Sequence, residues 1–220
     1  MTMAGSRNAA AEVASAHPTS RPRRPRGVGR LMRLHLESRR VPAALVLMAA
    51  CGAVFQGVLR WPGSHGSLQI PLIIEAAAAA IVAVTTHSPF GESERATGRW
   101  LPYLRGGAAA GLTTASFAAL LAGAVGANLL GGTEALLRDV AGMAGVGLLS
   151  AAALGGWLSW IGPMAYLALA EEALSSGWHT PWTWPARPPG DLGGALCAAL
   201  VFFAGLAVVA IRGARAIGRE

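Results

Sequence analysis

The chain has 220 residues, of which 53% are hydrophobic and only 13% are charged. Soluble domains carry about 25% charged residues, so this composition excludes an ordinary soluble domain and indicates a polytopic membrane protein. The net charge of +7 is local, because residues 1–40 hold nine arginines against two glutamates.

The N-terminal 40 residues are expected on the cytoplasmic side. Residues 1–26 are rich in Ala, Ser, Pro and Arg without apolar periodicity, which predicts a disordered basic cytoplasmic tail. We expect this tail to contact the anionic lipid leaflet and no nucleic acid, because no folded binding module accompanies it. In residues 27–40, Val28, Leu31 and Leu34 recur every third residue among arginines, which favours an interfacial amphipathic helix over a plain juxtamembrane linker.

Six apolar stretches follow, and a helix of roughly 20 such residues crosses a hydrocarbon core of about 30 Å. We expect a transmembrane domain over residues 41–211 and a second cytoplasmic tail over 212–220, with spans at 41–59, 68–86, 106–130, 135–156, 157–174 and 192–211. Six spans put both termini on one side, which then carries fifteen arginines against three on the other. The positive-inside rule makes that side cytoplasmic, so the sequence predicts an all-α, six-span protein of the inner (plasma) membrane.

Glu75 is the candidate polar residue inside a span. An ionisable side chain at membrane depth is a functional candidate, yet Glu75 lies only about two turns into its span. A carboxylate there can also reach headgroup water or pair with a neighbouring helix, and the sequence leaves these alternatives open.

Other local features carry structural expectations. Glycines 142, 145 and 147 predict close helix packing of the small-xxx-small kind. Pro163 inside the fifth span predicts a kink. Arg138 and Asp139 are expected to pair at the membrane interface. Three tryptophans in residues 175–191 indicate an interfacial belt or a partly re-entrant loop.

No pattern of catalytic residues occurs. There is no GxxxxGK[ST] loop for phosphates, no HExxH motif and no Cys/His ligand cluster, so we expect no enzyme, cofactor or metal site. Cys51 and Cys197 lie in apolar runs, where Cys is usually a packing residue. Glu171-Glu172 invites comparison with intramembrane proteases that use Glu-Glu-x-x-x-Arg, but the last position is Ser176.

The order of these elements resembles the ABC-2-type transporter permeases. The stretches 88–92 (Ser-Pro-Phe-Gly-Glu), 157–163 (Trp-Leu-Ser-Trp-Ile-Gly-Pro) and 180–185 (Thr-Pro-Trp-Thr-Trp-Pro) look like segments of actinobacterial membrane proteins of that kind. The resemblance covers about residues 27–215. The chain departs from many such permeases in its shorter length and leaner loops.

The resemblance implies the permease subunit of an ABC exporter. A separately encoded ATP-binding subunit would dock on residues 92–99, with Glu92, Glu94, Arg95 and Arg99 as the candidate coupling residues. A second permease protomer, identical or different, would complete the pathway. Export is favoured because no substrate-binding domain is apparent. The alternative is a non-transport scaffold that recruits a cytoplasmic partner through its basic tail; a secondary transporter is disfavoured because no inverted repeat is evident.

Overall fold

The structure is a computed structural model, and it describes residues 41–61, 69–86, 101–127, 129, 131–178 and 180–213. The expected basic tail (1–26), interfacial helix (27–40) and coupling segment (92–99) lie outside these residues. Every regular element in the described part is helical, which confirms the all-α prediction.

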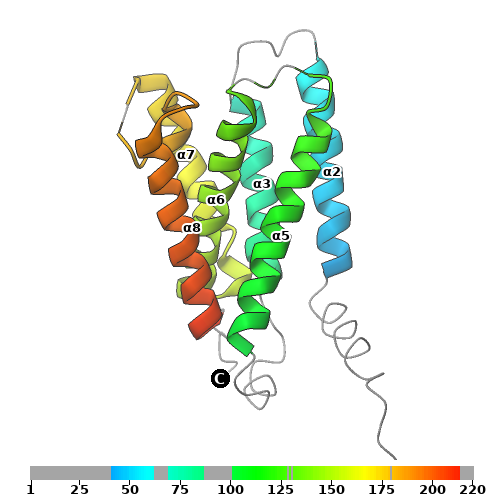
Figure 1. Ribbon diagram of the computed structural model, residues 1–220, viewed down its shortest axis with the longest axis vertical. Helices are drawn as coiled ribbons and strands as arrows, with labels where there is room; N and C mark the ends of the chain where they lie inside the picture. Colours follow the sequence, from blue (N-terminus) through cyan, green and yellow to red (C-terminus); the bar gives the residue numbers. More distant parts are fainter. Residues whose placement is uncertain are drawn as a thin grey trace, which may run out of the picture. The chain divides into compact units, whose positions relative to one another are not determined.

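Six α-helices and two 3₁₀ turns make up the described chain. Their bounds are α2 Val41–Arg60, α3 Gln69–Thr85, α5 Leu101–Gly123, α6 Gly132–Leu154, η2 Gly156–Leu158, α7 Ile161–Ser176, η3 Trp184–Ala186 and α8 Leu192–Arg212. Successive helices run in opposite directions, so the α5–α6 and α7–α8 connections lie at one end of the bundle and the α6–α7 turn lies at the other (Figure 1). We call the end with the α7–α8 connection, residues 177–191, the loop end.

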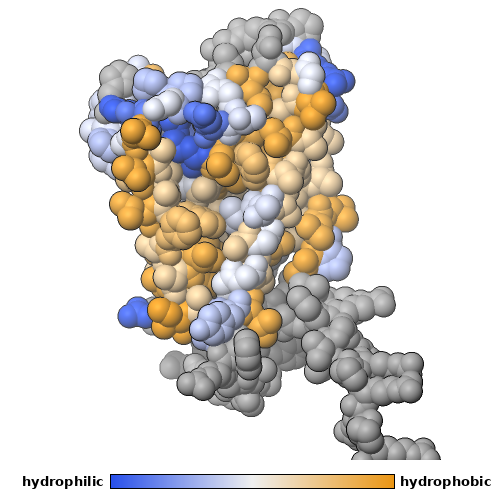
Figure 2. All heavy atoms as spheres, in the orientation of Figure 1, coloured by the Kyte–Doolittle hydropathy of each residue, from blue (hydrophilic) through white to orange (hydrophobic). Residues whose placement is uncertain are grey.

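Four of these helices are long and apolar enough to cross a membrane, namely α2, α5 from Pro102, α6 and α8. The two shorter helices are α3 with 17 residues and α7 with 16. Large apolar side chains are exposed along the outer helices, including Leu196, Leu200 and Phe203 on α8. Hydrophobic residues cover most of the bundle in Figure 2, while hydrophilic ones gather at the loop end. A multi-pass membrane protein accounts for this surface, because lipid replaces water around it.

Helix α6 is the centre of the bundle. About 67% of its most apolar window is buried, against 22% for α2 and for α8. Glycines allow this: a Cβ at Gly145 would come within 2.6 Å of the Phe202 backbone, and one at Gly205 within 2.6 Å of the Gly145 carbonyl oxygen. The close packing expected of the α6 glycines is therefore confirmed, here against α8.

The bounds of α5 differ most from the sequence-based expectation. Helix α5 begins at Leu101 and ends at Gly123, not at 106 and 130, so residues 101–105 are helical. Pro102 fits there because the first turn of a helix needs no N–H from it.

Pro163 lies in the first turn of a helix and not in the interior of one, where the sequence predicts a kink. The predicted fifth span is divided into η2 and α7, and Pro163 is the third residue of α7. In that first turn its missing N–H breaks no helical hydrogen bond.

Candidate functional site

A cavity of about 440 Å³ lies at the loop end of the bundle. It is lined by α2, α3, α6, the end of α7 and the α5–α6 and α7–α8 connections. Most of its wall is apolar, and three ionisable side chains from the helices reach it: Glu75 of α3, and Arg138 and Asp139 of α6.

These three residues lie at one depth. Glu75 is the seventh residue of α3 and Arg138 the seventh of α6, and both helices start at the loop end. At 1.5 Å per residue, each lies about 9 Å below its helix start. Glu75, Arg138 and Asp139 are only 6%, 6% and 8% exposed, so the cluster is inside the protein.

Arg138 joins the helices to the loop. Its Nε donates to Asp139 Oδ1 at 3.0 Å, and its Nη1 and Nη2 donate to the carbonyl oxygens of Pro188 and Arg187 at 2.9 and 3.4 Å. The expected local pairing of Arg138 with Asp139 is confirmed, but the pair is buried and not at an exposed interface. A planar guanidinium suits this role because it donates in several fixed directions.

Glu75 differs from its two neighbours. Its Oε2 is buried and accepts no hydrogen bond from any residue that the structure describes. A buried polar atom without a partner is costly, so such an atom in a cavity wall marks a place where a ligand or water can bind.

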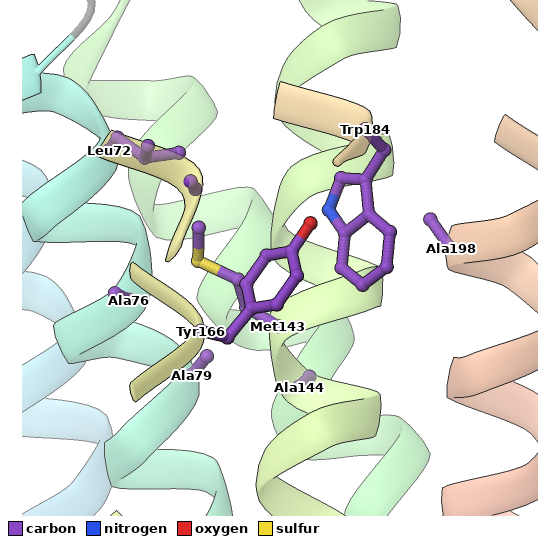
Figure 3. Close-up of a cluster of buried hydrophobic side chains, with 9 residues drawn as sticks. Leu72, Ala76, Ala79, Met143, Ala144, Tyr166, Trp184 and Ala198 are labelled. Carbon is purple, nitrogen blue, oxygen red and sulfur yellow. The ribbon is translucent and has the colours of Figure 1, made fainter. Parts of the chain in front are cut away.

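Residues 185–189 of the α7–α8 connection line the cavity, and aromatic packing holds this connection in place. The Trp184 ring stacks on Tyr166 of α7, with centroids 4.3 Å apart and planes 21° apart, and Figure 3 shows the two rings beside Met143. The Tyr166 hydroxyl donates to the Trp182 carbonyl oxygen at 3.0 Å. The expectation of a tryptophan belt holds only in part: Trp178 and Trp182 are each 45% exposed, whereas Trp184 is 2% exposed and belongs to the core.

An ion pair holds the last part of this connection. Arg187 donates from Nε and Nη2 to the two carboxylate oxygens of Asp191, at 3.0 and 2.6 Å. Asp191 also caps α8 by accepting from the Gly194 N–H at 2.6 Å. The hydrogen bond from Arg187, and after it the one from Gly194, lowers the pKa of Asp191 to about 2. The hydrogen bond to Asp191 in turn raises the pKa of Arg187.

The structure describes only one of the predicted site residues. Glu75 is buried in a cavity wall, while Glu92, Glu94, Arg95 and Arg99 lie outside the described residues. We did not predict from the sequence that Arg138 and Asp139 line the same cavity as Glu75. Because the fourth span is predicted to begin at 135, Arg138 lies only about one turn inside it there, and no local pattern links it to Glu75. Within the described ranges, no group of three or more His, Cys, Asp or Glu side chains could hold a metal ion.

Comparisons with known proteins add no relative: no family model, no curated protein and no solved structure matches the chain.

Proposed function

We propose that this chain is the permease subunit of an ABC exporter driven by a separately encoded ATPase, with all six helices crossing the membrane and both termini in the cytoplasm. The observation that carries the proposal is the cavity that Glu75, Arg138 and Asp139 line inside a largely apolar helical bundle. Ionisable residues are expensive at membrane depth and commonly mark substrate or ion pathways.

The orientation places this cavity on the outer side. With the N-terminus of α2 in the cytoplasm, the loop end faces outward, as the positive-inside rule also requires. An exporter needs a compartment open to that side in one of its states. The apolar walls suit an amphiphilic substrate, and the short connections leave no room for a substrate-capturing domain among the described residues.

The second protomer has a candidate contact on α5. Its exposed face carries small residues at helical spacing, with Gly107, Gly111, Thr114 and Ala118 exposed in succession. In Figure 2 a pale stripe interrupts the hydrophobic surface where Figure 1 draws α5. The Thr114 hydroxyl donates back to the Ala110 carbonyl oxygen at 3.0 Å, so the stripe presents no unsatisfied donor. Such a stripe supports helix association in lipid.

Affinity purification in mild detergent from the native host, with mass spectrometry, tests the function. We expect a stoichiometric partner that carries a phosphate-binding loop, and we expect Glu94→Arg with Arg95→Glu to lose it. Glu134→Arg, an exposed charge change at the loop end, is the matched control and should keep the partner. Recovery of partners without a nucleotide-binding motif would favour the scaffold that the nine arginines of residues 1–40 suggest.

A further inference from the structure

The Glu75 carboxylate is the least satisfied polar group in the cavity wall. It is 6% exposed, and its buried Oε2 has no hydrogen-bond donor within the described chain. Hydrogen bonds to a charged group are among the stronger ones in proteins, so a ligand that brings a donor to this oxygen gains more than usual.

The two arginines that line the cavity already have hydrogen-bond partners. Arg138 donates to Asp139 and to two carbonyl oxygens of the loop, and Arg187 is paired with Asp191. Asp139 has its partner in Arg138, whereas Glu75 has none among these side chains. Glu75 is therefore the acid of the described cavity wall whose ionised form lacks a cation, and a cationic ligand supplies one where an anion or a neutral molecule does not.

The remaining wall is apolar. Phe55, Leu59, Leu72, Leu136 and Leu174 line the cavity together with prolines from the loop. Its volume of about 440 Å³ lies within the roughly 300–1,000 Å³ of small-molecule sites. A ligand that fits must then be apolar over most of its surface and positive at one point.

We propose that this cavity binds a lipophilic ammonium compound, whose N–H donates to Glu75 Oε2 while its apolar body packs against the leucines and Phe55. As the substrate class of the exporter, this assignment rests on the proposed function. As a binding site, it is measured on the chain alone, without an ATPase.

Equilibrium dialysis against the protein in lipid nanodiscs, with empty nanodiscs subtracted, provides the test. The probes are benzyldimethylammonium and isobutylbenzene, which have nearly the same shape and differ by the charged N–H. We expect the wild type to bind the ammonium probe at least about tenfold more tightly than the neutral one, the smallest factor that a charged hydrogen bond typically gives. Glu75→Gln, which keeps the shape and removes the charge, should abolish this preference.

Glu171→Gln is the matched control. Glu171 also has a buried carboxylate oxygen without a partner in the described chain, but it does not line the cavity, so its variant should keep the full preference. Equal binding of the two probes by the wild type, binding of neither, or an undiminished preference in Glu75→Gln each overturns the proposal. The wild-type comparison needs no variant, so it can overturn the proposal even if Glu75→Gln fails to fold. A scaffold protein with this site would pass the binding test and yet recover no ATPase, so the two proposals fail separately.

Discussion

The indole of Trp184 lies against the backbone of Gly142, so close that a Cβ at Gly142 would come within 2.5 Å of the ring carbons Cε2 and Cζ2. The contact joins the α7–α8 connection to the central helix. Trp184 stacks on Tyr166 from this position, and the Tyr166 hydroxyl in turn holds the Trp182 carbonyl. The missing side chain of Gly142 thus determines how closely the α7–α8 connection packs against α6.

We predict that Gly142→Ala displaces Trp184 and destabilises the protein. Overpacking a well-packed core costs about 1–3 kcal/mol. Denaturant titration in detergent, followed by tryptophan fluorescence, measures the loss. Gly57→Ala is the control, because nothing lies within 4 Å of a Cβ there and alanine favours the helix. Equal stability of the two variants would show that Trp184 does not depend on Gly142.

The sequence predicts the bounds of α2, α3 and α8 to within one residue and those of α5, α6 and α7 less well. Helices α2 and α8 start where predicted and each ends one residue later, because their apolar runs are bounded by arginines and turn residues. For α5, the Pro at 102 and the charge of Arg105 resemble a loop, although a proline is tolerated in the first turn and arginine is a good helix former. A single-sequence pattern does not distinguish a proline that starts a helix from one that bends it. For this reason the sequence predicts Pro163 inside a span, whereas it lies in the first turn of α7.

The candidate site was predictable only in its parts. Glu75 stands out because a carboxylate within an apolar run is conspicuous. Its companions do not, since Arg138 follows the start of its own span and reads as an interfacial residue. The contact that defines the site joins Arg138 to Pro188, 50 residues apart in the chain. No local spacing encodes such a pairing, which depends on how α6 packs against the α7–α8 connection.

Asp191 gives a prediction on pH. Its pKa of about 2 in the folded protein lies below the value of about 3.9 for a free aspartate. Its stabilising effect is therefore complete above about pH 4 and is lost as the pH falls through about 2. The amide chemical shift of Gly194, which donates to this carboxylate, should titrate with a midpoint of about 2.

Asp191→Asn supplies the control for that titration. Asparagine keeps an acceptor for the Gly194 amide and removes the ionisation, so the shift should stay flat between pH 4 and pH 2. Asp191→Ala should loosen the start of α8 more than Asp191→Asn does, because it removes the cap as well as the ion pair. A midpoint near 4 in the wild type would mean that Arg187 does not hold the carboxylate in solution.

The stripe of small residues on α5 predicts where two protomers meet. Gly111→Ile places a bulky side chain where a Cβ meets nothing within 4 Å in the monomer, so the fold should tolerate it. The same side chain would separate two helices packed through this face, and dimer formation in nanodiscs should fall severalfold. Single-molecule subunit counting measures this. Gly57→Ile, equally open but on α2, should leave the dimer intact, and equal effects of the two variants would place the contact elsewhere.

The buried pair of Arg138 and Asp139 gives the largest predicted effect. Replacing Arg138 with methionine leaves Asp139 with no cation among its described neighbours and takes a donor from the carbonyl oxygens of Pro188 and Arg187. Breaking one side of a buried ion pair typically costs about 3–5 kcal/mol, whereas replacing both sides with apolar groups costs far less. We therefore expect Arg138→Met to lower the free energy of unfolding more than Arg138→Met with Asp139→Leu, as measured by titration with a denaturing detergent. If the double variant is the less stable one, the unpaired carboxylate of Asp139 is not what destabilises Arg138→Met, because both variants lose the donation to the loop and only the double variant removes the carboxylate.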